Sequence, residues 1–223
     1  MRSILEEETA VGHPKDDQKI DLQHLNVKLL LEGAAALDPA VLDAIIPIFH
    51  GWIQSRVVLN QDAPELLIDV ADYRHVHHGP GIVLIGHEAD YAIDTTDGRL
   101  GLRYNRKAQL TAPDLQTSDK KLVQAIRAAL TAAKHLEEDT RLNGKRHFNG
   151  HDIEIFINDR LIAPTNDATR QAFDPVLRQL LARLFGGSEY SVRYESDSRR
   201  LFGASIHTER VFSVQELIHN LNF

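Results

Sequence analysis

The segment 65–107 constrains the fold most, because apolar and polar residues alternate along it in short runs that turn signals interrupt. The first signal is Gly79-Pro80, and the second is Asp97-Gly98, a pair that favours a tight hairpin. Alternation places successive side chains on opposite faces of a strand. The segment therefore predicts three strands joined by hairpins.

Two amphipathic helices flank this strand-rich segment. The first is predicted over residues 38–54, with Asp38 as N-cap and Pro39 at the first helical position, where its missing N–H costs nothing. Pro47 is expected to kink or interrupt that helix. The second, over residues 117–139, is the clearest helix of the chain, because its apolar stripe is built on good helix formers.

The order of elements predicts two similar units. A strand over residues 26–33 comes first, so the first unit runs β-α-β-β-β-α. The second unit is predicted to run β-α-β-β-α. Its elements fall at residues 152–163, 174–187, 189–196, 199–208 and 213–221.

Sequence similarity between the helices at 38–51 and 174–187 suggests an internal repeat, with halves at 26–140 and 150–223. The alternative is that two amphipathic helices with the same cap look alike. Strand-helix-strand order with short connections favours helices on one face of the sheet. We expect an α+β fold, a two-layer α/β sandwich with a mixed sheet, for which two duplicated ferredoxin-like units are one arrangement.

Composition predicts a soluble cytoplasmic protein. Residues 1–25 have little periodicity and are expected to form a mobile N-terminal arm, while residues 26–223 form a single compact domain. A signal peptide and an apolar run of ~20 residues are both missing, which argues against a membrane partner. The formal charge of -7 disfavours nucleic acid. Without cysteine, the chain has no disulfides, thiolate metal sites or Cys nucleophile.

The first hairpin predicts a pair of polar residues on its apolar face. If the turn centres on Gly79-Pro80, Asp72 lies directly opposite His87. A buried carboxylate needs a partner, and a histidine supplies one. The pair is either a catalytic couple for acid–base chemistry or a satisfied polar pair inside the core.

Further candidate residues lie on the opposite face and in a loop. His75 and His77 point the same way along the strand, and with Glu88 they could hold a divalent transition metal. The alternative is a set of surface histidines that hydrogen-bond locally. Tyr73 and Arg160 are candidate ligand-binding residues.

The second hairpin extends both faces by one strand. Centring it on its Asp-Gly pair places Tyr91 opposite Tyr104 and Glu88 near Lys107. The tyrosine pair is therefore expected on the apolar face.

Two functional hypotheses follow. The first is a non-catalytic ligand-binding or assembly protein, because no strong catalytic motif is present. The alternative is a His/carboxylate metal-dependent hydrolase-like enzyme that uses the hairpin at 72–91. Strands without edge-blocking prolines also predict a homo-oligomer formed through a sheet face or edge.

Overall fold

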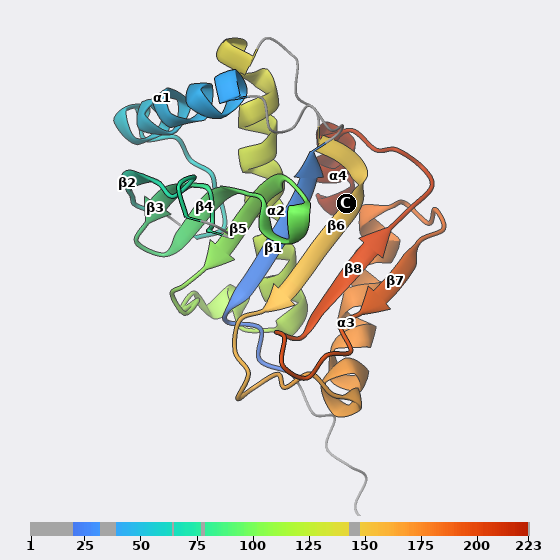
Figure 1. Ribbon diagram of the computed structural model, residues 1–223. Coiled ribbons are helices and arrows are strands. Elements are labelled where there is room, and N and C mark those ends of the chain that lie inside the picture. Colours follow the sequence, from blue (N-terminus) through green and yellow to red (C-terminus); the bar gives the residue numbers. More distant parts are fainter. Residues whose placement is uncertain (1–19, 32–38, 64, 77–78, 143–147, 223) are drawn as a thin grey trace, which may run out of the picture.

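The computed structural model describes residues 20–31, 39–63, 65–76, 79–142 and 148–222. These residues form an α+β fold with one open eight-stranded sheet, and Figure 1 shows α2, α3 and α4 behind it. In spatial order the strands are β2 (Leu67–Asp72), β3 (Ile82–Gly86), β4 (Ala89–Asp94), β5 (Gly101–Arg106), β1 (Leu25–Leu31), β6 (Phe148–Ile157), β8 (Gly203–His207) and β7 (Ser191–Tyr194).

The prediction of a mixed sheet is wrong, because all pairings between the described strands are antiparallel. The reason lies in the crossovers. The connection from β1 leads to β2 at one edge of the sheet, and that from β6 leads to β7 at the other edge. Strands joined through a helix are therefore not neighbours, so no parallel pair arises.

The helices of the described residues pack on one face of the sheet. They are α1 (Pro39–Ser55), α2 (Ser118–Glu138), α3 (Asp167–Leu184) and α4 (Val214–Leu221). The central helix α2 places Ile126 and Leu130 in one apolar core with Val27, Leu102 and Ile155 of the sheet. In the described part of the chain, no helix has the length and apolar character that crossing a bilayer requires.

Helix α1 continues through Pro47 instead of ending there. The carbonyl of Pro47 accepts a hydrogen bond of 2.8 Å from Arg141 Nη1. Ile48 and Phe49, the next two residues, are fully buried. Packing of this apolar face thus maintains a helix that local sequence predicts to kink or break.

The segment 65–107 contains four strands, one more than predicted. The additional turn, at His87-Glu88, separates β3 from β4. At Gly86 a Cβ would lie 2.3 Å from the carbonyl oxygen of Ala89, so the close approach of the two strands requires glycine. The turn lacks Pro, Asn or an Asp-Gly pair, and its sequence resembles a continuous strand.

Helix α3 begins well before the predicted residue 174. Asn166 is its N-cap, and the Asn166 side chain accepts a hydrogen bond of 2.9 Å from Thr169 N. Pro175 lies inside the helix, so the Asp-Pro pair there does not cap it. The predicted glycine end is confirmed, because Gly186 and Gly187 have positive φ angles of 56° and 79°.

The two halves share an order of elements. Each runs strand, helix, antiparallel strands, helix, and their first strands, β1 and β6, pair at the centre of the sheet. Outward from this pair, the first half continues with β5, β4, β3 and β2, and the second with β8 and β7. A shared order of elements does not by itself establish a duplication.

The end of the predicted N-terminal arm belongs to the folded domain. Ile20 and Leu22 are buried, and Leu25 opens β1. The remainder of that prediction, residues 1–19, lies outside the described residues.

Candidate functional site

The predicted register of the first hairpin is wrong. Asp72 pairs with Ile82, not with His87, and the connection between β2 and β3 spans residues 73–81. His87 follows Gly86, at the opposite end of β3. The contact on which the proposed acid–base couple depended is therefore not formed.

The early end of β2 has a local cause. The Asp72 carboxylate accepts a hydrogen bond of 3.0 Å from Arg74 N, which turns the chain immediately after the strand. Arg74 also donates from Nη2 to Asp72 at 2.6 Å and from Nη1 to Asp43 at 2.7 Å. The Arg74 guanidinium lowers the pKa of Asp72 to about 2. Asp72 is thus part of an exposed ion cluster, and His87 is an exposed residue beside Glu88.

The structure does not bring His75 and Glu88, two of the three predicted metal ligands, together. His75 is exposed in the β2–β3 loop, Glu88 lies at the far end of β3, and His77 lies outside the described residues. Within the described ranges, no group of three or more potential ligands could hold a metal ion. Tyr73 and Arg160 are also apart, because four strands separate β2 from β6.

The predicted register of the second hairpin is confirmed. Tyr91 pairs with Tyr104 across β4 and β5, and Lys107 N donates a hydrogen bond of 2.9 Å to Glu88 O. Both tyrosines face the helices and are buried, with ring centroids 5.2 Å apart. Tyr104 forms part of the wall of a polar cavity.

This cavity has a volume of about 230 Å³, far above the ~10–15 Å³ that one water molecule needs. It lies between the α1–β2 loop, the end of β5 and the segment that follows. Its floor contains buried Tyr104 and Arg106, and its rim contains exposed Gln109 and Thr111. The other lining residues are Asn60, Asp62, Ala63, Glu65, Glu88, Ala108, Leu110 and Ala112.

Glu65 is the principal carboxylate of the cavity. It accepts hydrogen bonds from Tyr91 Oη at 2.5 Å, Asn60 Nδ2 at 3.1 Å and Tyr104 Oη at 3.5 Å. Burial raises the pKa of Glu65, and the hydrogen bonds from Tyr91 and Asn60 oppose this shift. No cation lies within ion-pair distance of Glu65 in the described part of the chain. A desolvated carboxylate without a counter-ion in a cavity is typical of a functional site.

The α1–β2 loop holds Glu65 in this position. Asn60 is buried, and its Oδ1 accepts hydrogen bonds of 3.1 Å from both Asp62 N and Ala63 N. The same side chain donates to Glu65. One asparagine therefore shapes the loop and orients the carboxylate.

Arg106 provides the opposite charge. Its Nε donates to Gln23 O at 2.6 Å, its Nη1 donates to Lys121 O at 3.0 Å and to Gln124 Oε1, and its Nη2 donates to Leu22 O. All these acceptors are neutral. Burial lowers the pKa of the Arg106 guanidinium, and interactions with Tyr104, Asp21 and Glu65 oppose this shift. An arginine side chain stays protonated in proteins.

The two charges belong to one polar network. Gln124 Nε2 donates a hydrogen bond of 3.2 Å to Tyr104 Oη, which in turn contacts Glu65. Burial raises the pKa of Tyr104, and the Glu65 charge adds to this effect. Both tyrosines therefore stay protonated and act as donors at neutral pH. The network can orient a polar ligand, because its donors and acceptors are already in place.

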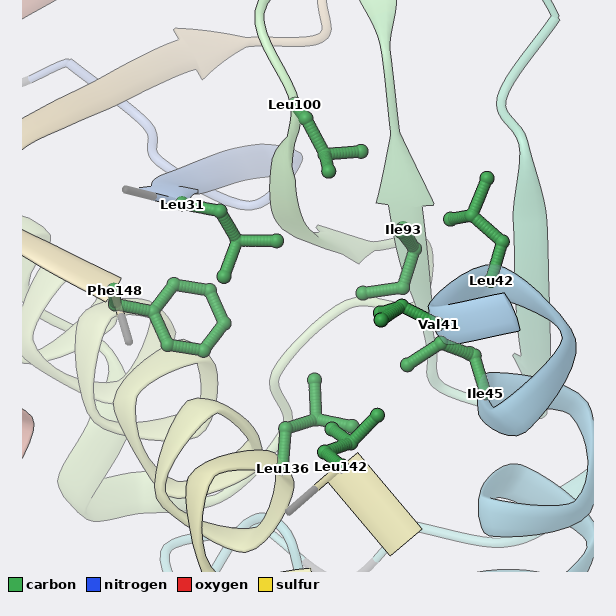
Figure 2. Close-up of a pocket in the computed structure, with 9 residues that line it drawn as sticks. All are labelled: Leu31, Val41, Leu42, Ile45, Ile93, Leu100, Leu136, Leu142 and Phe148. Atoms are coloured by element: carbon green, nitrogen blue, oxygen red, sulfur yellow. The ribbon is translucent and has the colours of Figure 1, made fainter. Parts of the chain in front are cut away.

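A second cavity is apolar and small. Figure 2 shows the apolar side chains from β1, α1, β4, α2 and neighbouring segments that surround it. Its volume is about 20 Å³, close to that of one water molecule. Among the described residues, its lining contains no polar group that could orient a ligand, so we interpret it as a gap in the packing of the core.

Charges on the helix-free face are paired with one another. Lys28 and Asp94 are buried and lie 2.9 Å apart, and Lys28 Nζ also donates to Thr96 O at 3.3 Å. Arg99 pairs with Glu154 at 2.6 Å. These contacts hold the β4–β5 loop against the sheet. Asp94 and Glu154 therefore each have a counter-ion.

A His–Asp pair does exist, but between residues that sequence analysis did not select. His207 Nδ1 lies 2.9 Å from Asp152 Oδ1, and the ring centroids of His207 and His151 are 5.2 Å apart. Hydrogen bonding to Asp152 raises the pKa of His207. The pair lines neither cavity, so we treat it as a surface cluster.

Sequence analysis missed Asn60, Glu65 and Arg106. The first two are loop residues without periodicity. Arg106 falls on the same face as Tyr104 by strand alternation, which was a usable signal of its burial. Comparison with family models, curated proteins and solved structures finds no match for this chain. The cavity itself is therefore the basis for inferring a function.

Proposed function

We propose that the protein binds a small polar molecule in the cavity around Glu65. One observation carries the proposal. Glu65 occupies a desolvated position beside a cavity of about 230 Å³ without a cationic partner among the described residues. Burial of an unpaired carboxylate is unfavourable for folding, and a ligand can supply the missing partner.

The surroundings of Glu65 support binding because they are preorganised. Three side chains donate to the carboxylate from a loop, a strand and the neighbouring strand. A ligand would therefore meet a carboxylate whose orientation is already set, which reduces the entropic cost of binding.

NMR titration tests the proposal with a panel of small sugars, amines, amino acids, carboxylic acids and nucleobases. We expect at least one class to shift backbone resonances of the cavity residues. Ala108→Leu places a larger side chain at the cavity and should abolish those shifts. The same substitution at exposed Ala182 is the control and should leave them unchanged. Binding that survives Ala108→Leu, or no shift with any compound, would contradict the proposal.

Glu65→Gln tests whether the ionised carboxylate destabilises the fold. The folded-state pKa of Glu65 is raised, so the ionised group destabilises the fold above that pKa, and the penalty vanishes below the unfolded pKa of about 4.3. Chemical denaturation should show Glu65→Gln more stable than the wild type at pH 8, with a difference that shrinks toward pH 4. Such a gain on removing a functional group is a known trade-off.

We also propose that the halves arose by duplication. The shared order of elements and the central β1–β6 pair support this. The different position of the Asp-Pro pair in α3 weighs against it. Separate expression of residues 20–140 and 150–223 provides a test, since a repeat origin predicts that a fragment can pair with a second copy of itself through its first strand.

A homo-oligomer in the cytoplasm is a further proposal. Ile68 on edge strand β2 and its neighbour Leu66 are exposed, which supports an interface at this edge. The Asp69 side chain, however, accepts a hydrogen bond of 2.8 Å from Val70 N. This backbone N–H is therefore not available to pair with a strand of another copy. Light scattering that shows only monomer at high concentration would contradict the oligomer.

A further inference from the structure

The cavity contains two opposite charges that are not paired with each other. Glu65 lies in the α1–β2 loop and Arg106 at the end of β5, and both line the cavity. In the described residues, neither the carboxylate nor the guanidinium has an oppositely charged group within ion-pair distance. Tyr104 hydrogen-bonds Glu65, and it interacts with Arg106 both directly and through Gln124. The two charges therefore lie at separate places on the cavity wall.

Of the other two acids that line the cavity, Asp62 has a cationic partner and Glu88 is held by a backbone N–H and a histidine. The Asp62 carboxylate forms an ion pair of 2.5 Å with Arg127. The Glu88 carboxylate accepts a hydrogen bond of 2.9 Å from Leu66 N and contacts His87 at 3.2 Å. Glu65 is more deeply buried than Glu88, so we assign it as the negative charge that binds the ligand.

Arg106 brings a guanidinium charge to the wall of the cavity. Its hydrogen bonds go to neutral acceptors, and they include one to Tyr104. Glu65 and Asp21 attract the guanidinium, but neither lies within ion-pair distance of it. A carboxylate bound at this wall would therefore supply a counter-ion at closer range.

On the basis of the proposed function, we propose that the ligand is a small zwitterion, an amino acid or a close analogue. Its ammonium group binds the Glu65 carboxylate, and its carboxylate lies toward Arg106. A simple cation would leave the Arg106 charge without a counter-ion, and a simple anion would be repelled by Glu65. A zwitterion satisfies both charges and keeps the net charge of the site unchanged.

Three compounds with the same number of carbon atoms test this assignment: β-alanine, n-propylamine and propionate. NMR titration of the full chain should show that β-alanine binds at least tenfold more tightly than n-propylamine, since its carboxylate is attracted by the Arg106 charge, and that propionate binds most weakly. Glu65→Gln should weaken β-alanine binding at least tenfold. Glu209→Gln, at a side chain that is 98% exposed, should leave it unchanged.

The outcomes separate this inference from the proposed function. Tightest binding of propionate or n-propylamine in the cavity would overturn the zwitterion and leave a small-molecule site in place. Equal binding of β-alanine by the wild type and Glu65→Gln would also overturn it. If the broader compound panel shows no binding in the cavity, the proposed function fails and the zwitterion fails with it.

Discussion

Replacement of Arg106 by Met should detach the N-terminal segment from the domain. Arg106 donates to the carbonyl oxygens of Leu22 and Gln23, which precede β1 and lie outside helices and strands. Met has a similar length and fills the same space without any donor. The substitution therefore tests the hydrogen bonds and keeps most of the packing.

The magnitude follows from the acceptors left without a donor. Each buried polar group that loses its partner costs about 1–3 kcal/mol, so the carbonyls of Leu22 and Gln23 together cost about 2–6 kcal/mol. Loss of the donors to Lys121 O and Gln124 Oε1 adds to this cost. Removal of a buried charge offsets part of this loss. We expect Arg106→Met to lower the free energy of unfolding by about 3 kcal/mol, a large share of the ~5–15 kcal/mol typical of a domain.

Chemical denaturation measures the loss, and hydrogen exchange locates it. Amides of residues 20–25 should lose protection first, because Ile20 and Leu22 are anchored beside the Arg106 contacts. Lys107→Met is the matched control on the next residue. The Lys107 side chain is 38% exposed and pairs with Asp90 at 2.8 Å, so its loss should change stability by less than about 1 kcal/mol.

A small effect would refute this reasoning. If Arg106→Met lowers stability by no more than the Lys107→Met control and leaves exchange at residues 20–25 unchanged, Arg106 does not anchor the segment. The carbonyls of Leu22 and Gln23 would then have other partners in solution.

Two further predictions concern the second half of the sheet and a loop of the first. Gly150→Ala should destabilise the fold by more than about 3 kcal/mol in denaturation experiments, because φ is +64° and a Cβ would lie 1.6 Å from the carbonyl oxygen of Phe212. Gly98→Ala, at φ +71° with nothing within 4 Å, should lose only about 1–2 kcal/mol. NMR titration should place the pKa of His207 above 6.5, and Asp152→Asn should lower it. Because the folded-state pKa is raised, the stabilisation by this pair is present below pH 6.5 and is lost as pH rises through the His207 pKa, and an unchanged pKa in Asp152→Asn would contradict it.

The sequence by itself determined the elements whose signals are local. The register of β4 and β5 follows from an Asp-Gly turn and strict alternation, so Tyr91 and Tyr104 were correctly paired. Helix α2 follows from its apolar stripe and good helix formers, and the Gly186-Gly187 pair ends α3. These features depend on the backbone geometry of a few neighbouring residues. The pattern of residue types along a short segment is enough to predict them.

The predicted register of the first hairpin is wrong for an equally local reason. The Gly79-Pro80 pair resembles the centre of a turn, but the Asp72 side chain ends its strand by accepting from Arg74 N. The sequence contains both signals, an aspartate that can turn the chain at Asp72 and the Gly-Pro pair. The turn at Asp72 ends the strand, so Asp72 pairs with Ile82 and does not contact His87.

Only the tertiary structure decided the site. Glu65 meets Tyr91 and Tyr104 because a loop after α1 lies beside the middle strands, and Arg106 meets Leu22 across more than eighty residues of sequence. Such contacts depend on which strands become neighbours. Strand order in turn depends on where the crossover helices pack, because burial of their apolar faces involves the whole sheet at once. No periodicity within a single segment of the sequence predicts the strand order. The cavity and its two charges could therefore be identified only from the tertiary structure.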